Sequence, residues 1–219
     1  MSDSLQVLTA EQVLESDLPD WRQLYASLHT RYLTTEFANG LRLVAAIGAV
    51  VEAAGHHPEI TLTQDFIDVS LTSHDAGGVT ARDVELARSI SAVAAEQGVD
   101  ADPSARSIFE IALDTPDHEK IAPFWAAALG YEVDGDEVHG QAGIGPTLWF
   151  QHREPDDEQR FHLDVRVPHD IAAQRIQQVL DAGGTVVRDG SPAYVVLQDV
   201  DGNKACICTN LGREGWSAP

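Results

Sequence analysis

The chain has 219 residues, of which 43% are apolar, so it can form one large domain or two of about 100 residues each. Its 35 acidic and 14 basic residues give a formal net charge of −21, and a field of this sign repels nucleic acid and anionic membranes. No apolar run approaches the roughly 18 residues of a membrane span. The start of the chain lacks the basic and apolar regions of a secretion signal, so we expect a cytoplasmic protein.

The two cysteines, Cys206 and Cys208, lie near the end of the chain with one residue between them. We expect them to point to opposite faces of a strand, which would keep their sulfur atoms apart and leave no internal disulfide. Reduced thiols are typical of the cytoplasm, so the cysteines also favour that location.

The first half of the chain alternates helix and strand signals. Thr9 and Gln12 have the spacing of a capping box, which predicts a short helix at the start. Residues 22–33 then predict two strands with a turn near residues 29–30. Apolar side chains at helical spacing predict a long, half-buried helix over residues 35–54.

A hairpin and another helix follow. Residues 59–63 and 65–73 alternate apolar and polar side chains and predict two paired strands. Thr80 and Asp83 form a second capping-box pattern, which predicts a helix that ends near Gly98. The order is therefore α-β-β-α-β-β-α, which is typical of an α+β domain with a four-stranded antiparallel sheet and its helices on one face.

A polar stretch with a proline at residues 99–106 predicts a linker between two domains, at residues 1–98 and 107–219. The second domain contains a weak internal repeat at an offset of about 52 residues. Each copy predicts a strand, a helix and three more strands, with helices near 118–129 and 170–182. We therefore expect two βαβββ units.

Three of the chain's nine histidines and two carboxylates lie close together in the sequence, from the end of one long predicted helix to the start of the next. The cluster comprises Glu52, His56, His57, His74 and Asp83. Each has a simpler interpretation alone: Asp83 as a helix cap, Glu52 as a solvated helix residue, and a histidine favoured by the helix dipole. Histidine exchanges a proton near neutral pH, and two placed imidazoles can act as acid and base. Together, at a helix end and a strand end of one sheet, these residues predict the active site of a proton-transfer enzyme.

This pattern resembles the signature of the pterin-4a-carbinolamine dehydratases over residues 5–98. The motifs are Glu52-x3-His56-His57-Pro58, Thr72-x-His74, Gly78-x-Thr80-x-x-Asp83, Leu18-Pro19-x-Trp21 and Phe37. That family of hydro-lyases converts 4a-hydroxytetrahydropterin to quinonoid dihydropterin in pterin recycling, without metal or cofactor, and forms oligomers. The resemblance therefore implies a homo-oligomer with a pterin substrate.

The resemblance also implies a role for each site residue. His56 and His74 would be the acid–base pair, and His57 would hold the substrate. Glu52 and Asp83 would be supporting carboxylates, and Trp21 would lie near the substrate. Gln64 stands where the family usually has an aromatic residue, which weakens the expected stacking on the pterin and leaves the substrate's identity open.

The second domain resembles the vicinal oxygen chelate, or glyoxalase-like, superfamily over about residues 107–210. The motifs are Phe124-Trp125-x3-Leu129-Gly130, Phe161-His162-Leu163-Asp164 and Asp199-x-Asp201-Gly202-Asn203. Metal-dependent members place four ligands on paired strands, and the matching positions are Glu110, Gln151 or His152, His162 and Cys206. Glu110 and His162 suit a divalent metal. Cys206 stands where glutamate is usual, so we expect a metal-free pocket here.

Three functions remain open. The first domain can be a working 4a-hydroxytetrahydrobiopterin dehydratase, with the glyoxalase-like domain in an accessory or ligand-binding role. The second domain can instead be a metal-dependent glyoxalase or dioxygenase, with the first as a dimerisation module. The whole chain can also be a non-catalytic small-molecule-binding protein. The intact set of His56, His57 and His74 favours the dehydratase.

Overall fold

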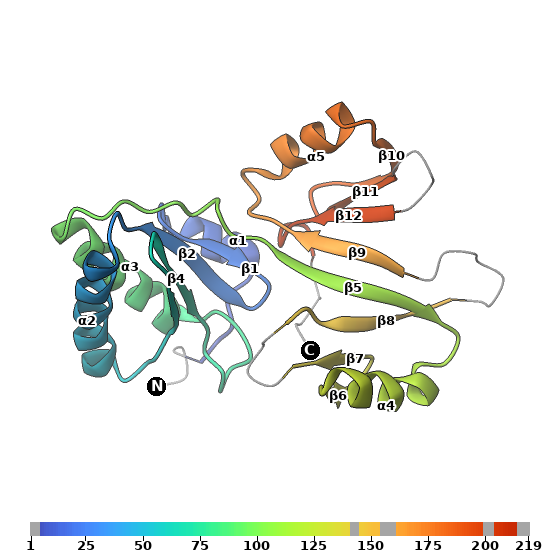
Figure 1. Ribbon diagram of the computed structural model, residues 1–219, viewed down its shortest axis with the longest axis horizontal. Coiled ribbons are helices and arrows are strands. Elements are labelled where there is room, and N and C mark those ends of the chain that lie inside the picture. The colour runs from blue at the N-terminus through green and yellow to red at the C-terminus, as the bar shows by residue number, and fades with distance from the viewer. Residues whose placement is uncertain (1–4, 141–144, 154–160, 199–203, 214–219) are drawn as a thin grey trace. The chain divides into compact units, whose positions relative to one another are not determined.

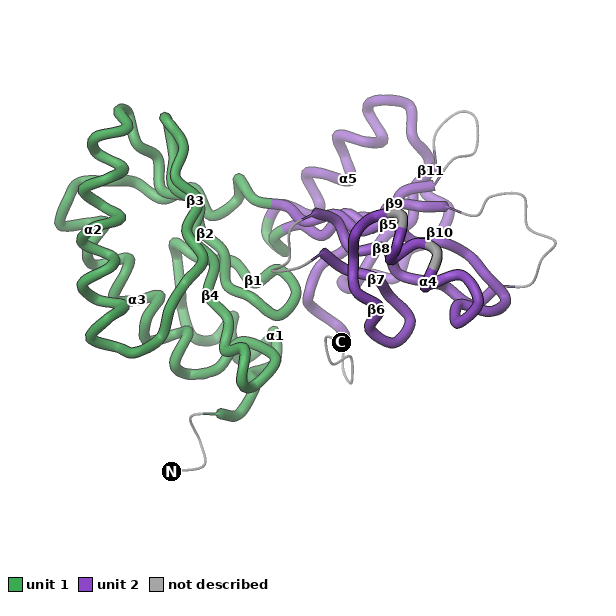
Figure 2. The backbone as a smooth tube through the Cα atoms, turned by 60° about the horizontal axis from the view of Figure 1, so that its bottom comes forward, with its two compact units in different colours: residues 1–106, 168–170, 218 green, residues 107–167, 171–217, 219 purple. Residues whose placement is uncertain are grey.

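The computed structural model describes residues 5–140, 145–153, 161–198 and 204–213. Its backbone divides into two compact units, which Figure 2 distinguishes by colour. Unit 1 consists mainly of residues 1–106 and unit 2 mainly of residues 107–217. Each unit has its own sheet and its own buried core.

Unit 1 is an α+β domain with the predicted order of elements (Figure 1). Its elements are α1 (Ala10–Glu15), β1 (Arg22–Leu24), β2 (Ser27–Leu33), α2 (Phe37–Ala54), β3 (Glu59–Leu62), β4 (Phe66–Leu71) and α3 (Ala81–Glu96). The four strands form an antiparallel sheet in the order β1-β2-β4-β3. The predicted fold class of this half is confirmed.

The core of unit 1 lies between one face of the sheet and the long helices. It joins Tyr32 of β2, Ile67, Val69 and Leu71 of β4, Leu43, Ile47 and Val51 of α2, and Val84, Ala87 and Ile90 of α3. Helix α2 ends at Gly55, which has a φ of +61° and whose N–H donates to the Val51 carbonyl over 2.9 Å. A glycine adopts this left-handed cap without steric cost. The cap places His56 directly beyond the helix end.

The turn between β1 and β2 lies at Tyr25-Ala26, so the prediction of a turn near residues 29–30 is wrong. Tyr25 has a φ of +56°, a conformation that is uncommon for residues other than glycine and asparagine. The residue type therefore gave no turn signal. His29 and Thr30 instead lie within β2, where they are buried.

The segment that was expected to link the domains packs along the end of β2. The Leu33 N–H donates to the Asp100 carbonyl over 2.9 Å, and the Asp102 N–H donates to the Arg31 carbonyl over 2.7 Å. The Arg106 guanidinium pairs with buried Asp68 over 2.6 Å. These contacts attach residues 100–106 to unit 1.

Unit 2 contains two βαβββ repeats, as predicted. The first comprises β5 (Ile108–Thr115), α4 (His118–Leu129), β6 (Glu132–Asp134), β7 (Glu137–His139) and β8 (Leu148–His152). The second comprises β9 (Phe161–Arg166), α5 (Ala172–Asp181), β10 (Thr185–Gly190), β11 (Tyr194–Gln198) and β12 (Lys204–Cys208). All strands join one sheet in the order β10-β11-β12-β9-β5-β8-β7-β6.

The two repeats meet at the centre of this sheet. Strands β5 and β9 pair antiparallel, and each pairs on its other side with a parallel strand, β8 or β12. Alternate residues pack against a helix: Leu113, Val138, Leu148 and Phe150 against α4, and Val195, Leu197 and Ile207 against α5. Since successive side chains of a strand point to opposite faces, the residues between them project from the other face.

Candidate active site

His56 and Asp83 form the central contact of the predicted site. The Nε2 atom of His56 lies 2.7 Å from Oδ1 of Asp83. The Asp83 side chain is fully buried, and that of His56 is 14% exposed. Because a carboxylate only accepts hydrogen bonds, Nε2–H donates to it. The neutral ring then carries its lone pair on Nδ1, the nitrogen that can take up a proton.

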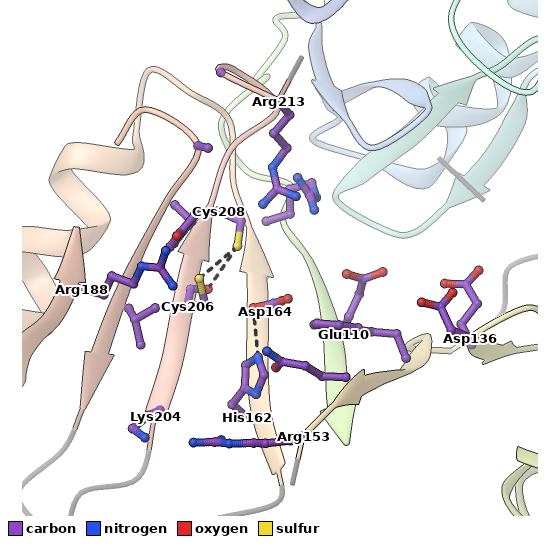
Figure 3. Close-up of a pocket in the computed structure, with 18 residues that line it drawn as sticks. Glu110, Asp136, Arg153, His162, Asp164, Arg188, Lys204, Cys206, Cys208 and Arg213 are labelled. Carbon is purple, nitrogen blue, oxygen red and sulfur yellow. Dashed lines mark hydrogen bonds and ion pairs between the residues drawn. The ribbon is translucent and has the colours of Figure 1, made fainter. Parts of the chain in front are cut away.

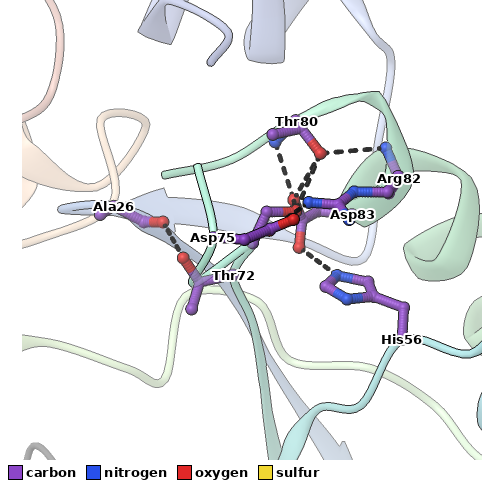
Figure 4. Close-up of polar contacts among 8 residues, drawn as sticks. Ala26, His56, Thr72, Asp75, Thr80, Arg82 and Asp83 are labelled. Carbon is purple, nitrogen blue, oxygen red and sulfur yellow. Dashed lines mark hydrogen bonds and ion pairs between the residues drawn. The ribbon is translucent and has the colours of Figure 1, made fainter. Parts of the chain in front are cut away.

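The second carboxylate oxygen of Asp83, Oδ2, accepts hydrogen bonds from neighbouring residues of unit 1 (Figure 4). Oδ2 accepts from the Ser73 hydroxyl over 2.7 Å, from the Thr80 N–H over 2.7 Å and from the Thr80 hydroxyl over 3.1 Å. A buried charge needs such partners. The capping box read from the sequence is present, and its aspartate also orients His56.

The other predicted residues lie in different surroundings. His57 Nε2 is 3.4 Å from Glu52 Oε1, with both side chains strongly exposed, 65% and 80%, so this pair is worth little to stability. His74 is exposed and lies in the turn between Ser73 and Gly78, which bridge to each other.

Trp21 lies in the core of unit 1 with only 3% of its surface exposed. Its indole N–H donates to the Ser91 hydroxyl over 3.0 Å, and its ring meets that of Tyr32 edge to face. In the described structure Trp21 therefore packs the core, and its contact with substrate stays a prediction.

Ser73, Asp75 and Arg82 surround the site, and the sequence motifs did not predict them as site residues. Arg82 pairs with Asp75 over 2.5 Å. This hydrogen bond lowers the pKa of Asp75, and the charge of Arg82 adds to the effect. Ser73 reaches Asp83 because the tight turn before α3 brings the two together. Its position directly before His74 is the one sequence feature that could have identified it.

Unit 2 has a cavity of about 870 Å³ on the sheet face opposite its helices (Figure 3). Its lining includes Glu110, Gln151, His162, Asp164, Cys206 and Cys208. Five of the chain's 14 basic residues also line it: Arg153, Arg166, Arg188, Lys204 and Arg213. Strand β8 contributes Gln151, rather than its neighbour His152, to this lining. The motif at residues 199–203 lies outside the described residues.

Burial sets the protonation of Glu110. It raises the pKa of this carboxyl to about 7; the charge of Asp164 adds to the rise and Arg166 opposes it. Glu110 and Asp164 face each other across β5 and β9. A carboxyl with a pKa near neutrality can either donate a proton to a ligand or accept a proton from it.

The two cysteines share one face of β12, so the prediction of opposite faces is wrong. Residues two apart in a strand project to the same side. Cys208 Sγ lies 3.3 Å from Cys206 Sγ, and both are buried free thiols. The Cys208 thiol and burial raise the pKa of Cys206.

Comparison with protein families assigns both halves of the chain. Residues 4–93 match the family described as Pterin 4 alpha carbinolamine dehydratase, and residues 110–208 match the Glyoxalase-like domain. A Halobacterium salinarum protein that carries the name pterin-4-alpha-carbinolamine dehydratase is 37% identical over 89 residues, which are 40% of this chain and 93% of that protein.

Two solved structures resemble one half each. The transcriptional coactivator/pterin dehydratase of Brucella melitensis is 26% identical, covers 41% of this chain and 99% of its own, and has a TM-score of 0.39. A glyoxalase/bleomycin resistance protein/dioxygenase superfamily member from Vibrio splendidus is 14% identical, covers 48% and 99%, and has a TM-score of 0.34.

Proposed function

Because the chain belongs to the pterin-4-alpha-carbinolamine dehydratase family through residues 4–93 and carries a glyoxalase-like domain at residues 110–208, we propose that unit 1 dehydrates 4a-hydroxytetrahydropterin to quinonoid dihydropterin. Unit 1 is an enzyme of the hydro-lyase type. The observation that carries the proposal is the contact of 2.7 Å between His56 and fully buried Asp83. This contact gives one imidazole a fixed orientation and a fixed tautomer.

The proposed chemistry needs two proton transfers. The departing 4a-hydroxyl takes up a proton so that it leaves as water, and a ring nitrogen of the pterin loses one. An imidazolium can supply the first proton and a neutral imidazole can accept the second. His56, with Nε2–H donated to Asp83, suits the accepting role through Nδ1. Exposed His74 then supplies the proton to the leaving oxygen.

The remaining predicted residues have supporting roles in this proposal. His57, exposed beside Glu52, holds the substrate, and Asp83 positions His56. Gln64 is exposed and offers no aromatic ring for stacking. The assay that tests the proposal follows the decay of 4a-hydroxytetrahydropterin against its uncatalysed background, and absence of acceleration by the wild-type protein contradicts it.

We expect the dehydration to survive removal of metal, because proton transfer between histidines and substrate requires no metal or other cofactor. Protein dialysed against a strong chelator should keep its rate of 4a-hydroxytetrahydropterin turnover. The measurement compares the treated and untreated protein at equal concentration. A loss of rate that added zinc or iron restores would contradict the assignment of the chemistry to His56, His57 and His74.

Unit 2 is proposed to bind a small molecule in an accessory role. Its cavity of about 870 Å³ has the size of a ligand pocket. The alternative is a metal-dependent glyoxalase or dioxygenase reaction in this cavity, which Glu110 and His162 would serve. The net charge of −21 disfavours nucleic acid or an anionic membrane as a partner, and the free cysteines favour the cytoplasm.

Helix α2 supports a homo-oligomer. It is 18 residues long with a mean hydropathy of 1.4, which by length and composition could cross a membrane. Leu43, Ile47 and Val51 are buried in the core of unit 1, whereas Phe37 and Leu41 are about half exposed, 50% and 51%. A second copy of the chain would cover this apolar face.

Leu41→Glu is therefore expected to shift the protein toward its monomer, because the charge would be buried between copies. Sedimentation velocity at tens of micromolar, roughly where obligate dimers persist, measures the change. Leu14→Glu is the matched control, since Leu14 is 49% exposed but lies on α1. A wild-type protein that sediments as a monomer would contradict the proposal.

A further inference from the structure

Two parallel strands of unit 2 place a carboxylate beside the pair of thiols. Strands β9 and β12 pair with Asp164 opposite Cys206, and Arg166 opposite Cys208. Asp164, Cys206 and Cys208 all line the cavity, on the face away from α5 (Figure 3). The parallel register therefore brings three groups that can bind a metal to one spot.

The three donor groups are close enough to share one ion. The two sulfur atoms are 3.3 Å apart, and the sulfurs and a carboxylate oxygen of Asp164 all lie within 4.8 Å of one another. Within the part of the chain that the structure describes, this is the single group of three such residues at that spacing. The set predicted by resemblance, with Glu110 and His162, is not gathered in this way.

We propose that Asp164, Cys206 and Cys208 form a binding site for a thiophilic divalent cation, with zinc as the expected ion. Thiolate and carboxylate are both zinc ligands, and thiolates select zinc over magnesium or calcium. With Zn–S bonds of about 2.3 Å in a tetrahedron, the sulfurs would stand about 3.8 Å apart. The thiols need to separate by only about half an ångström.

The charges around the site suit a bound ion. Two thiolates and one carboxylate carry three negative charges, so the complex with zinc keeps one negative charge. Arg166 and Lys204 line the same cavity; Arg166 is the cross-strand neighbour of Cys208. Their positive charges offset the surplus. Three protein ligands leave a fourth position for water or a small ligand in the cavity, as in catalytic zinc sites.

The competing interpretation treats the cysteines as small buried packing residues. A spectroscopic titration separates the two interpretations sharply, because the chain has only two cysteines. Any absorption band from charge transfer between thiolate and metal must therefore come from Cys206 or Cys208. Metal held by the histidines of unit 1 would give no such band.

The experiment uses the full, untagged chain, reduced and freed of metal, and titrates it with cadmium while the ultraviolet charge-transfer band is recorded. Zinc affinity is measured in parallel by competition with a chromophoric chelator. The band should grow to one equivalent of cadmium per chain. Cys206→Ser and Cys208→Ser should each weaken zinc binding by at least about 100-fold, beyond the 10–100-fold losses typical of outer-shell partners.

Two further variants fix the identity of the site. Asp164→Asn should weaken zinc binding, whereas Asp136→Asn should leave the affinity unchanged, because Asp136 lines the same cavity but lies outside the group of three donors. Melting curves establish that each variant is folded. The proposal is overturned if folded wild-type protein shows no thiolate band at stoichiometric cadmium, or if zinc affinity is the same in the Cys206→Ser, Cys208→Ser double variant.

Discussion

His74→Ala is expected to lower the rate of 4a-hydroxytetrahydropterin dehydration by about 10²–10⁴-fold, the usual share of general acid–base catalysis. The proposal assigns His74 the proton that the leaving hydroxyl requires. Its side chain is exposed in the turn after β4, so its loss should leave the fold of unit 1 intact. Single-turnover kinetics, corrected for the uncatalysed background, measure the chemical step.

Three comparisons make this result specific. His57→Ala should raise KM more than it lowers kcat if His57 holds the substrate. The double variant His56→Ala, His74→Ala should be little slower than the slower single variant, because groups that act as a unit are not additive. His139→Ala, in unit 2, is the matched histidine control. A His74→Ala protein as fast as the wild type would leave the small-molecule-binding function as the better interpretation.

The fold of unit 1 could be predicted because its boundaries have local causes. Capping boxes at Thr9 and Thr80 and the left-handed Gly55 depend on a few neighbouring residues, and such signals are present in the sequence itself. The repeats of unit 2 were predictable for a similar reason. Because the same pattern of strands and helix occurs twice in the chain, the assignment of the elements in one repeat supports their assignment in the other.

The parts that could not be predicted depend on contacts between distant segments or on unusual backbone. Tyr25 adopts a positive φ that its residue type does not favour. The match of Asp164 with Cys206 requires the parallel register of β9 and β12, which no local pattern specifies. In contrast, the position of Cys206 and Cys208 on the same face of β12 could have been predicted, because it follows from the two-residue period of a strand alone.

The site in unit 1 was predictable as a set of residues but not as a geometry. The spacing of the residues from His56 to Asp83 identifies the motif in the sequence. The contact of 2.7 Å between His56 Nε2 and Asp83 Oδ1 and the complete burial of Asp83 depend instead on the packing of α3 against the end of α2. Ser73 completes the environment of Asp83 and has no sequence motif of its own. The buried aspartate is therefore the residue for which the structure adds most to the prediction.

Asp83→Asn is expected to lower the rate of dehydration by at least about 100-fold, within the range for general acid–base catalysis, while unit 1 stays folded. Oδ2 accepts three hydrogen bonds, from Ser73 and Thr80, so the amide oxygen of the asparagine should take that place. The amide NH2 then faces His56 Nε2 and donates to it. This donation moves the imidazole proton to Nδ1, which can no longer accept the substrate's proton.

The stability of this variant must be measured before its rate is interpreted, because the substitution removes a negative charge from the first turn of α3, where an acidic side chain stabilises the helix by about 1 kcal/mol. For a unit of this size that loss lowers Tm by about 4–8 °C. Thr80→Val is the matched control: it removes the capping hydroxyl at a similar cost. It also removes one of the three donors to Oδ2, but it keeps the donors Ser73 Oγ and Thr80 N–H and the contact of Oδ1 with His56. We expect Thr80→Val to melt early yet retain most of its rate, and Asp83→Asn to melt at a similar temperature with little rate left. Equal rates in the two variants would show that Asp83 acts only as a cap and that His56 does not depend on its carboxylate.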